Sequence, residues 1–390
     1  MKILHFCMQA PFTENYSYQD NLLTEYQHKH GHDVRIVTTT KTRGKDGRYT
    51  YTAPCHKMMD NGVELLRLQV KSRLRNAFGN YRGMLGQMID YQPDLIFIHG
   101  LCSFIPKDAI RYKKEYRPGL HIVADSHQDA WTTDTEDPLS SAMMAAHRRG
   151  WKRWINDIDK VYATTSWRAA FAHKYYGIPY EKLDVLIMGI DEDSLPRDRE
   201  GVRKELRRAL GIPDRAFVFI SGGKLDKNKH ILEAMRAFSL ISSADAYFVV
   251  FGSVSDDIQK EFFELCDADD RIRYLDYLDS KVIKKYLMSS DFGVFVGRHS
   301  VLWEEAVGCS LPCLFHRYEE KDHTNVCDNA VCIDTPDEDT IRGYMDKVLT
   351  DRVYYAQMKR NAEKAAKVFS YHTIAEKSVE CCNEEHNDKF

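Results

Sequence analysis

The chain has 390 residues, of which 43% are hydrophobic and 29% are charged, so it is long enough to form two domains that each bury a core. Its formal net charge of -3 argues against a dedicated nucleic-acid-binding protein, which is usually strongly basic. The ten cysteines include no C-x-x-C pair, so we expect reduced thiols and a cytoplasmic protein.

No apolar run approaches the roughly 20 residues that a helix needs to span a bilayer. The apolar run at residues 1–6 is too short for a signal peptide and is typical of a strand. We therefore expect a protein that is soluble or that contacts the inner face of a membrane at its surface only. Two basic and aromatic stretches, 71–78 and 147–154, leave two alternatives open: each is an ordinary helix surface or a contact with anionic lipid heads.

The first half of the chain alternates predicted strands with predicted helices. Apolar runs of strand type occur at Lys2–Cys7, Asp33–Thr38, Asp94–Ile98, His121–Ala124, Lys160–Thr164 and Asp184–Ile187. Helical patterns lie between them, for example at Asn21–Lys29 and Arg82–Tyr91. This alternation predicts a mainly parallel sheet with helices on both faces.

A polar junction near residues 190–200 separates this half from a second one, in which the same pattern restarts. The second set of predicted strands is Phe217–Ser221, Ala246–Phe251, Arg271–Tyr274, Phe292–Val296, Cys313–Phe315 and Ala330–Ile333. The fold class is therefore α/β with two Rossmann-like domains, which we place at 1–195 and 196–368. Residues 369–390 are assigned to a final helix, at about Thr373 to Glu380, and a polar tail.

A strand, a glycine turn and three lysines form a candidate anion site in the second half. The predicted strand Phe217–Ser221 ends in Gly222 and Gly223, and Lys224, Lys227 and Lys229 follow before a helix begins at Ile231. Glycine lets the backbone approach a ligand, and free N–H groups at a helix start favour phosphate. Lys224 and Lys229 are the candidate phosphate ligands, and Lys227 is assigned to the surface.

A second candidate segment follows the predicted strand Phe292–Val296. It contains Arg298 in a polar loop, Ser300 as the expected N-cap of a helix that starts at Val301, and Glu305 on that helix. Glu304 should point another way, because adjacent helical residues differ by about 100° in direction. Cys309, Cys313 and His316 surround the start of the next strand and fit buried small residues better than metal ligands.

At these two segments the sequence resembles the C-terminal half of the family 4, or group 1, glycosyltransferases of the GT-B fold. The family reads G-R-L-x-x-x-K-G, and here Gly223 to His230 match with Lys224 for arginine and His230 for the last glycine. The family also reads L-E-A-x-x-x-G-x-P, and here Glu304 to Pro312 match, with Glu304 for leucine and Ser310 for glycine. Of the usual E-x7-E pair only the second glutamate is matched, by Glu305, because Gly297 stands at the first position.

Weaker matches to the family lie in the first half: Gly31-His32-Asp33-Val34, Gln92-Pro93-Asp94, and the strand end before Gly189. The resemblance implies two Rossmann-like domains that face each other across a cleft, with a C-terminal helix that crosses back to the first domain. It implies a hexosyltransferase that acts with retention of configuration and without a metal or other cofactor. The donor would be a UDP-sugar or another nucleotide-diphosphate sugar, and the acceptor a saccharide or a lipid-linked molecule used in cell-surface polysaccharide or glycoconjugate synthesis.

The resemblance also implies roles for single residues. The donor residues would be Gly223, Lys224, Lys229, Arg298, Ser300 and Glu305, with Glu305 near the ribose. His127 resembles the family histidine that contacts the transferred sugar, so His127 and Glu305 are the candidate catalytic residues. His99 and Asp129 follow strands of the first domain, where open α/β sheets bind ligands, and are candidates for the acceptor side.

Two other function classes bear on this hypothesis. A dinucleotide-dependent oxidoreductase would need G-x-G-x-x-G after the first strand, but residues 8–13 contain no glycine. A catalytically degenerate GT-B protein that binds nucleotide or a partner without transfer stays open, because the first glutamate of the pair is missing. Nothing in the sequence fixes the oligomeric state.

Overall fold

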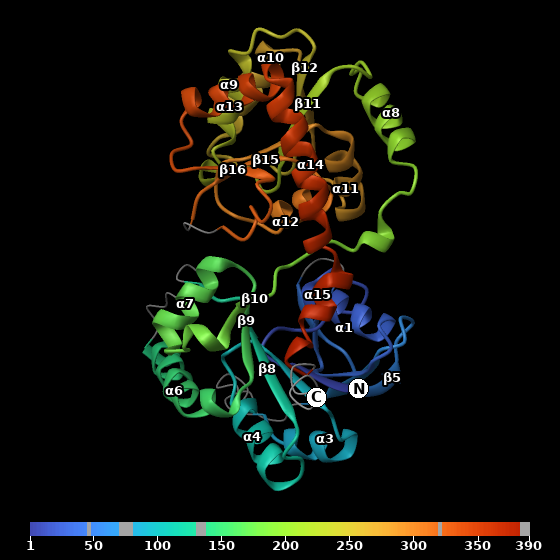
Figure 1. Cartoon of the computed structure of the whole chain (residues 1–390), viewed down its shortest axis with the longest axis vertical. Coiled ribbons are helices and arrows are strands. Elements are labelled where there is room, and N and C mark those ends of the chain that lie inside the picture. Colours follow the sequence, from blue (N-terminus) through green and yellow to red (C-terminus); the bar gives the residue numbers. More distant parts are fainter. Residues whose placement is uncertain (45–47, 70–80, 130–137, 319–321, 383–390) are drawn as a thin grey trace. The chain divides into compact units, whose positions relative to one another are not determined.

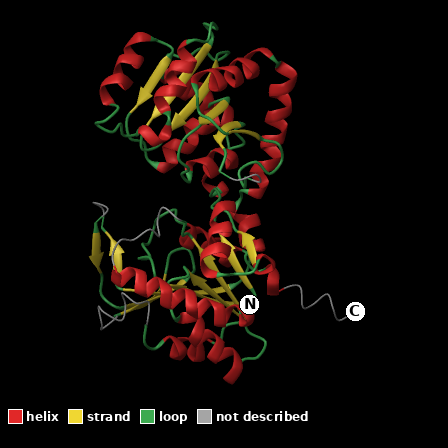
Figure 2. Ribbon diagram, turned by 90° about the vertical axis from the view of Figure 1, so that its left-hand side faces the viewer, coloured by secondary structure: helices red, strands yellow, loops and turns green. Residues whose placement is uncertain are grey.

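The computed structural model describes residues 1–44, 48–69, 81–129, 138–318 and 322–382. It divides into two compact α/β units (Figure 1): unit 1 holds residues 1–187 and 371–390, and unit 2 holds residues 188–370. In each unit the strands lie between helices (Figure 2). The basic stretch 71–78 and the tail from residue 383 fall largely or wholly outside the described residues. Within the described part of the chain, no helix is both long and apolar enough to cross a bilayer.

The main sheet of unit 1 has eight strands in the order β10-β9-β8-β7-β1-β2-β6-β5, all parallel except the antiparallel β5–β6 pair. Its strands are β1 Lys2–Cys7, β2 Asp33–Thr39, β5 Cys55–Met58, β6 Glu64–Leu68, β7 Leu95–His99, β8 His121–Ser126, β9 Lys160–Ala163 and β10 Leu183–Val185. A separate antiparallel hairpin joins β3 Lys41–Arg43 to β4 Tyr49–Tyr51. The longer helices are α1 Gln19–Lys29, α3 Met84–Tyr91, α4 Ile105–Glu115, α6 Pro138–Trp154 and α7 Ser166–Tyr176.

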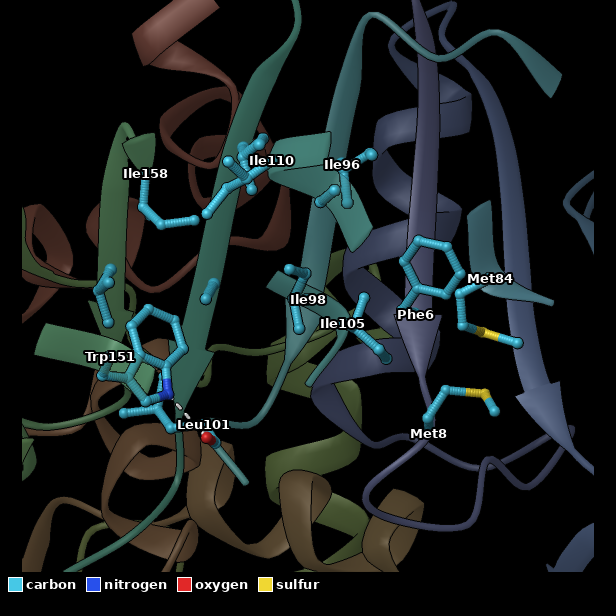
Figure 3. Packing of buried hydrophobic residues seen from close by; sticks show 14 of the residues in the cluster. Phe6, Met8, Met84, Ile96, Ile98, Leu101, Ile105, Ile110, Trp151 and Ile158 are labelled. Carbon is cyan, nitrogen blue, oxygen red and sulfur yellow. Dashed lines mark hydrogen bonds between the residues drawn. The ribbon is translucent and has the colours of Figure 1, made fainter. Parts of the chain in front are cut away.

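Apolar side chains from the strands and helices form one buried cluster in unit 1 (Figure 3). Phe6 and Ile98 come from parallel strands, and Trp151 of α6 is fully buried among them. The Trp151 indole N–H donates to the backbone oxygen of Leu101 at 2.7 Å, so its polar atom is satisfied inside the core. This packing fixes the ends of β7 and β8, which carry candidate residues of the first half.

The sheet of unit 2 is fully parallel, in the order β13-β12-β11-β14-β15-β16. Its strands are β11 Phe217–Gly222, β12 Ala246–Phe251, β13 Ile272–Leu275, β14 Phe292–Phe295, β15 Cys313–His316 and β16 Ala330–Ile333. Its longer helices are α8 Arg199–Ala209, α9 Ile231–Ser239, α10 Gln259–Ala268, α11 Ser280–Ser289, α12 Leu302–Gly308, α13 Glu338–Thr350 and α14 Arg352–Val368. The strands are buried on both faces, which explains why their sequences are continuous apolar runs.

The final helix, α15 (Tyr371–Lys377), belongs to unit 1 although it follows unit 2 in the chain. It packs along α1, where the rings of Tyr26 and Tyr371 lie 5.8 Å apart and the Gln27 side chain donates to Ser378 Oγ at 2.9 Å. The Tyr162 hydroxyl donates to the backbone oxygen of Lys377 at 3.0 Å. The return of the final helix to the first unit, expected from the resemblance, is confirmed.

The two Rossmann-like halves are confirmed, and the twelve predicted strands occur within two residues of their expected ends. The strands β3 to β6 were not predicted, because β4 and β5 are almost wholly exposed, β3 and β6 are only half-buried, and none is a long apolar run. Unit 2 also begins before residue 196: the Ile190 N–H donates to the backbone oxygen of Phe369 at 2.8 Å, and Ile190 fills the space beside Gly308. The unit boundary in the structure therefore falls at 187/188.

Candidate donor and acceptor sites

The turn after β11 depends on glycine. Gly223 has a φ of 112° and Gly252, at the end of the neighbouring β12, has a φ of 118°. A Cβ on Gly252 would lie 1.8 Å from the Gly223 carbonyl oxygen, and one on Gly222 would lie 2.5 Å from the Phe251 ring. The backbones of two adjacent strand ends therefore pack against each other at the glycine turn.

A 3-10 turn at Lys227–Lys229 comes between this glycine turn and α9. The Asp226 carboxylate caps the turn by accepting from the Asn228 N–H at 3.0 Å. His230 then adopts a φ of 51°, a left-handed conformation that glycine takes at lower cost. The helix that the sequence predicts at Ile231 is confirmed, but it does not follow the glycines directly.

The two candidate segments of unit 2 lie against each other. A Cβ on Gly297 would lie 2.3 Å from the backbone carbon of Lys229, so only glycine allows this approach. The Arg298 N–H donates to the backbone oxygen of Asn228 at 2.7 Å, and Lys229 Nζ donates to the backbone oxygen of Arg298 at 2.5 Å. The structure thus brings Lys229 and Arg298 together from positions about seventy residues apart.

The cationic side chains of these two loops are partly accessible to solvent. Burial lowers the pKa of Lys229 to about 8, an effect that Asp226 opposes and Arg298 reinforces. Lys224 and Arg298 are exposed, as an anion-binding role requires. Lys227 lies on the surface within 3.8 Å of the Asp257 carboxylate, in agreement with its assignment as a surface residue.

The role of Ser300 as an N-cap is wrong. Helix α12 starts at Leu302, its N-cap residue is Val301, and no side chain caps it. Ser300 precedes the cap by one position, and its hydroxyl oxygen is buried without a hydrogen-bond partner in the described part of the chain. The start of α12 still lies near the glycine turn, because a Cβ on Gly223 would lie 3.9 Å from Leu302 Cδ2.

Glu305 and Glu304 point to different neighbours, as their adjacency on a helix predicts. Glu305 is half-buried and accepts from Ser280 Oγ at 3.3 Å. Burial raises the pKa of its carboxyl group, while Lys284 acts in the opposite sense. Glu304 is fully buried and lies beside the imidazoles of His299 and His323, an arrangement that the sequence analysis did not foresee.

In unit 1, His99 and His127 share one carboxylate. His99 Nδ1 lies 2.7 Å from Asp125 Oδ2, and His127 Nε2 lies 3.5 Å from the same oxygen. Burial opposes the charge of His99, but Cys7 and Asp125 raise its pKa well above the ordinary value. Burial likewise opposes the charge of Asp125, and the two histidines hold its pKa below the ordinary range. The His127 side chain is 42% exposed and that of His99 is 11% exposed, so His127 is the more accessible to a ligand.

Asp125 is not among the predicted site residues, although its place at the end of a buried strand, two residues before His127, indicates it. It also accepts from the Gly100 N–H at 2.8 Å, so it joins the ends of β7 and β8. Asp129 is buried and its Oδ2 accepts from Arg168 Nε and Nη2 at 3.2 and 3.1 Å. An acceptor-side role for Asp129 stays a prediction, and the observed contact is an ion pair that anchors the loop after β8.

Comparison with known proteins gives two family matches. The family model described as Glycosyltransferase Family 4 matches residues 21–194, and the one described as Glycosyl transferases group 1 matches residues 202–365. The two matches cover the candidate residues of unit 1 and of unit 2 respectively. A search of curated proteins found no significant match to the chain.

Solved structures share the fold over the whole chain at low sequence identity. HepE from Anabaena, solved in complex with UDP, is 13% identical with a TM-score of 0.67, over 98% of this chain and 100% of that one. Sucrose-phosphate synthase from Thermosynechococcus elongatus is 12% identical with a TM-score of 0.65, over 100% of both chains. The catalytic domain of starch synthase IV from Arabidopsis thaliana, bound to ADP and acarbose, is 15% identical with a TM-score of 0.61, over 98% of both. These matches show that the chain has the GT-B fold.

Proposed function

Because the chain belongs to the group 1 glycosyl transferases, we propose that it moves a hexose from a UDP-sugar to an acceptor hydroxyl, with retention of configuration and without a catalytic metal. The observation that carries this proposal is the packing of the loop at Gly223–Lys229 against the loop at Gly297–Ser300. Two glycine-dependent turns with exposed cations suit a diphosphate. Relatives of the same fold were solved with UDP and with ADP, which supports a nucleotide donor.

Lys229, Lys224 and Arg298 would stabilise the nucleotide diphosphate as it leaves the sugar. Negative charge develops on the leaving oxygen in the transition state, and fixed cations nearby lower its energy. In the structure Lys229 Nζ donates to a backbone oxygen at 2.5 Å, so the ammonium group is already oriented toward the second loop. A phosphate oxygen would replace that carbonyl as its partner.

Glu305 and His127 would hold the sugar nucleotide and the transferred sugar. A half-buried carboxylate such as Glu305 can accept hydrogen bonds from ribose hydroxyls. Burial raises its pKa, and added hydrogen-bond donors would stabilise its charged form. His127, exposed and backed by Asp125, would contact the transferred sugar. Transfer would then require residues of both units, whereas nucleotide binding would require unit 2 alone.

The acceptor would be a saccharide or a lipid-linked molecule of cell-surface polysaccharide or glycoconjugate synthesis. A hollow of about 550 Å³ on unit 1 supports a surface contact with anionic lipid. It lies between α4 and α6, and its lining includes Lys107, Lys114, Arg149, Arg153 and Trp154. Basic residues around an indole suit the headgroup region of a membrane, although the Lys114 ammonium is also 2.9 Å from Asp157.

A catalytically degenerate protein that binds nucleotide without transfer is the alternative, because Gly297 replaces the first glutamate of the family pair. The test incubates the full chain with UDP-, GDP- and ADP-glucose, and measures both the thermal midpoint and the release of nucleoside diphosphate. A ligand of the native state raises the midpoint. The proposal predicts that a UDP-sugar raises the midpoint and is turned over. A raised midpoint with no release of UDP, with or without acceptor sugars, would favour the degenerate alternative.

A further inference from the structure

Three side chains of unit 2 form a buried cluster, which we call the His299 cluster: His299, Glu304 and His323. They come from the loop after β14, from α12 and from the segment after β15 (α12 and β15 are labelled in Figure 1). Nε2 of His299 and Nε2 of His323 each lie 2.9 Å from Oε1 of Glu304. Their side chains are 7%, 0% and 3% exposed, so the cluster is closed to bulk water.

The cluster contains two buried carboxylates whose charged neighbours in the described chain are histidines. Glu304 and the adjacent Asp322 have side-chain exposures of 0% and 1%. Among the residues that the structure describes, no lysine or arginine pairs with either carboxylate; both instead face histidine. Burying two carboxylates without opposite charge is costly, so their arrangement calls for cations within the cluster.

His323 lies between these two carboxylates. Its Nε2 faces Glu304 Oε1 at 2.9 Å, and its Nδ1 faces Asp322 Oδ1 at 3.4 Å. The contact to Glu304 is a hydrogen bond, whereas the contact to Asp322 is an ion-pair distance. Imidazoles that bind metal use one nitrogen as ligand and give the other N–H to a carboxylate. Asp322 suits that second role, because the Thr324 N–H and hydroxyl both donate to its Oδ1, at 3.0 and 2.7 Å, and hold it in place.

We propose that His299, Glu304 and His323 bind one divalent transition-metal ion, Zn²⁺ by preference, and that Asp322 orients His323. Their ligand atoms all lie within 4.8 Å of one another. Ligands on a tetrahedral ion at zinc distances lie about 3.4 Å apart, so the 2.9 Å contacts need to open only slightly. Oε2 of Glu304 is buried without a hydrogen-bond partner in the described chain, so it is available as a further ligand to the metal. Two imidazoles and a carboxylate are a ligand set that zinc favours, and its double charge balances the two buried carboxylates.

The ion would be structural. It would tie the loop that carries Arg298 to α12 and to the segment after β15, and it would need no substrate. The inference therefore goes beyond the proposed transferase activity and does not depend on it. Cys381, Cys382 and His121 form a second group with metal-ligand spacing in unit 1. A metal measurement must therefore exclude binding at these thiols.

The test measures the metal content of the full chain in a background that carries Cys381→Ser and Cys382→Ser, so that thiols of that second group contribute nothing. This protein and its His316→Asn variant, a control on β15 outside the cluster, should each hold about one zinc ion per chain. His323→Asn and Glu304→Gln should each hold less than about a tenth of that. Reloading the chelated protein with Co²⁺ should give visible d–d absorption that Glu304→Gln lacks.

Stability gives a second readout, because an ion bound only by the folded state raises the thermal midpoint. Chelation should lower the midpoint of the double-serine protein, and Zn²⁺ should restore it. The proposal is overturned if that protein is purified without metal and neither Zn²⁺ nor Co²⁺ changes its midpoint or spectrum. In that case the cluster is a hydrogen-bond network around a charged His323. This outcome is measured on the double-serine protein and does not depend on whether any cluster variant folds.

Discussion

Among single residues, Lys229 is the most important for the proposed donor site. Burial lowers its pKa to about 8, and its Nζ contacts the second loop of the proposed donor site at the backbone oxygen of Arg298. Lys229→Ala should lower the rate of transfer by on the order of a hundredfold and weaken UDP binding, because it removes one electrostatic stabiliser. Lys227→Ala is the matched control and should change neither. Wild-type affinity and rate in a folded Lys229→Ala protein would exclude Lys229 from the site.

The lowered pKa of Lys229 also predicts how binding depends on pH. Below pH 8 the ammonium form dominates and can bind a diphosphate, and above pH 8 the neutral amine dominates. UDP affinity should therefore fall as the pH rises from 7 to 9. The same shift acts on stability in the opposite sense: charged Lys229 is costly in the folded state, so its contribution improves between pH 8 and 10.5. Lys229→Arg should bind UDP with little pH dependence over the same range, and titration calorimetry of both proteins measures the difference.

In unit 1, His127 is the residue that we expect to take part in sugar transfer. It is exposed, and Asp125 lies 3.5 Å behind it. His127→Ala should keep UDP affinity, because it removes no donor contact in unit 2. It should lower the transfer rate by roughly a hundredfold or more, as for loss of a positioned catalytic group. Steady-state kinetics with saturating UDP-sugar measures the effect, and an unchanged turnover number would remove His127 from the mechanism.

At the scale of elements, two departures from the family pattern fall at strained turns. His230 and Ser310 replace glycines of the family motifs, and their φ angles are 51° and 64°. Ser310 follows α12, and its N–H donates to the backbone oxygen of Val307 at 2.9 Å, as in a helix C-terminus that glycine usually ends. The family's preference for glycine at both positions thus has a conformational cause.

Ser310 offers a direct test of that strain. Ser310→Gly should raise the free energy of unfolding by up to about 1 kcal/mol, because glycine takes this conformation without a Cβ clash but loses more entropy on folding. Ser310→Val should lower it by more than about 1 kcal/mol, because a β-branched residue is disfavoured there. Urea unfolding followed by fluorescence compares the two variants. Equal midpoints in both would show that the turn carries no strain.

The sequence predicted fully buried strands well, and it predicted exposed or half-buried strands less well. Strands buried on both faces, such as β1 and β12, are continuous apolar runs and were placed with their ends correct. The strands β5 and β6 were not predicted, because the edge strand β5 is almost wholly exposed and β6, which lies between β5 and β2, is only half-buried. The N-cap role of Ser300 failed because helix starts shift by a residue or two without any change in pattern.

The candidate sites show the same limit. Lys229 and Arg298 could be named because each follows an apolar strand that the sequence reveals. The sharing of Asp125 by His99 and His127 could not be seen, because it needs the register of two neighbouring strands, His99 opposite Asp125. The His299 cluster depends on contacts between residues 5 and 19 positions away from Glu304, which no local period encodes.

At the scale of the whole molecule, the chain is two units with a final helix that returns to the first. Every proposed donor contact lies in residues 188–370, and the acceptor-side candidates lie in unit 1. This arrangement separates nucleotide binding, which we assign to unit 2, from transfer, which also needs His127 of unit 1.

The most direct test is the UDP affinity of residues 188–370 expressed alone, measured by titration calorimetry beside the full chain. We expect dissociation constants that agree within about threefold, with no sugar transfer by the isolated unit. Circular dichroism and a cooperative thermal transition would establish that the unit is folded. A folded unit that binds no UDP while the full chain binds it would contradict the claim.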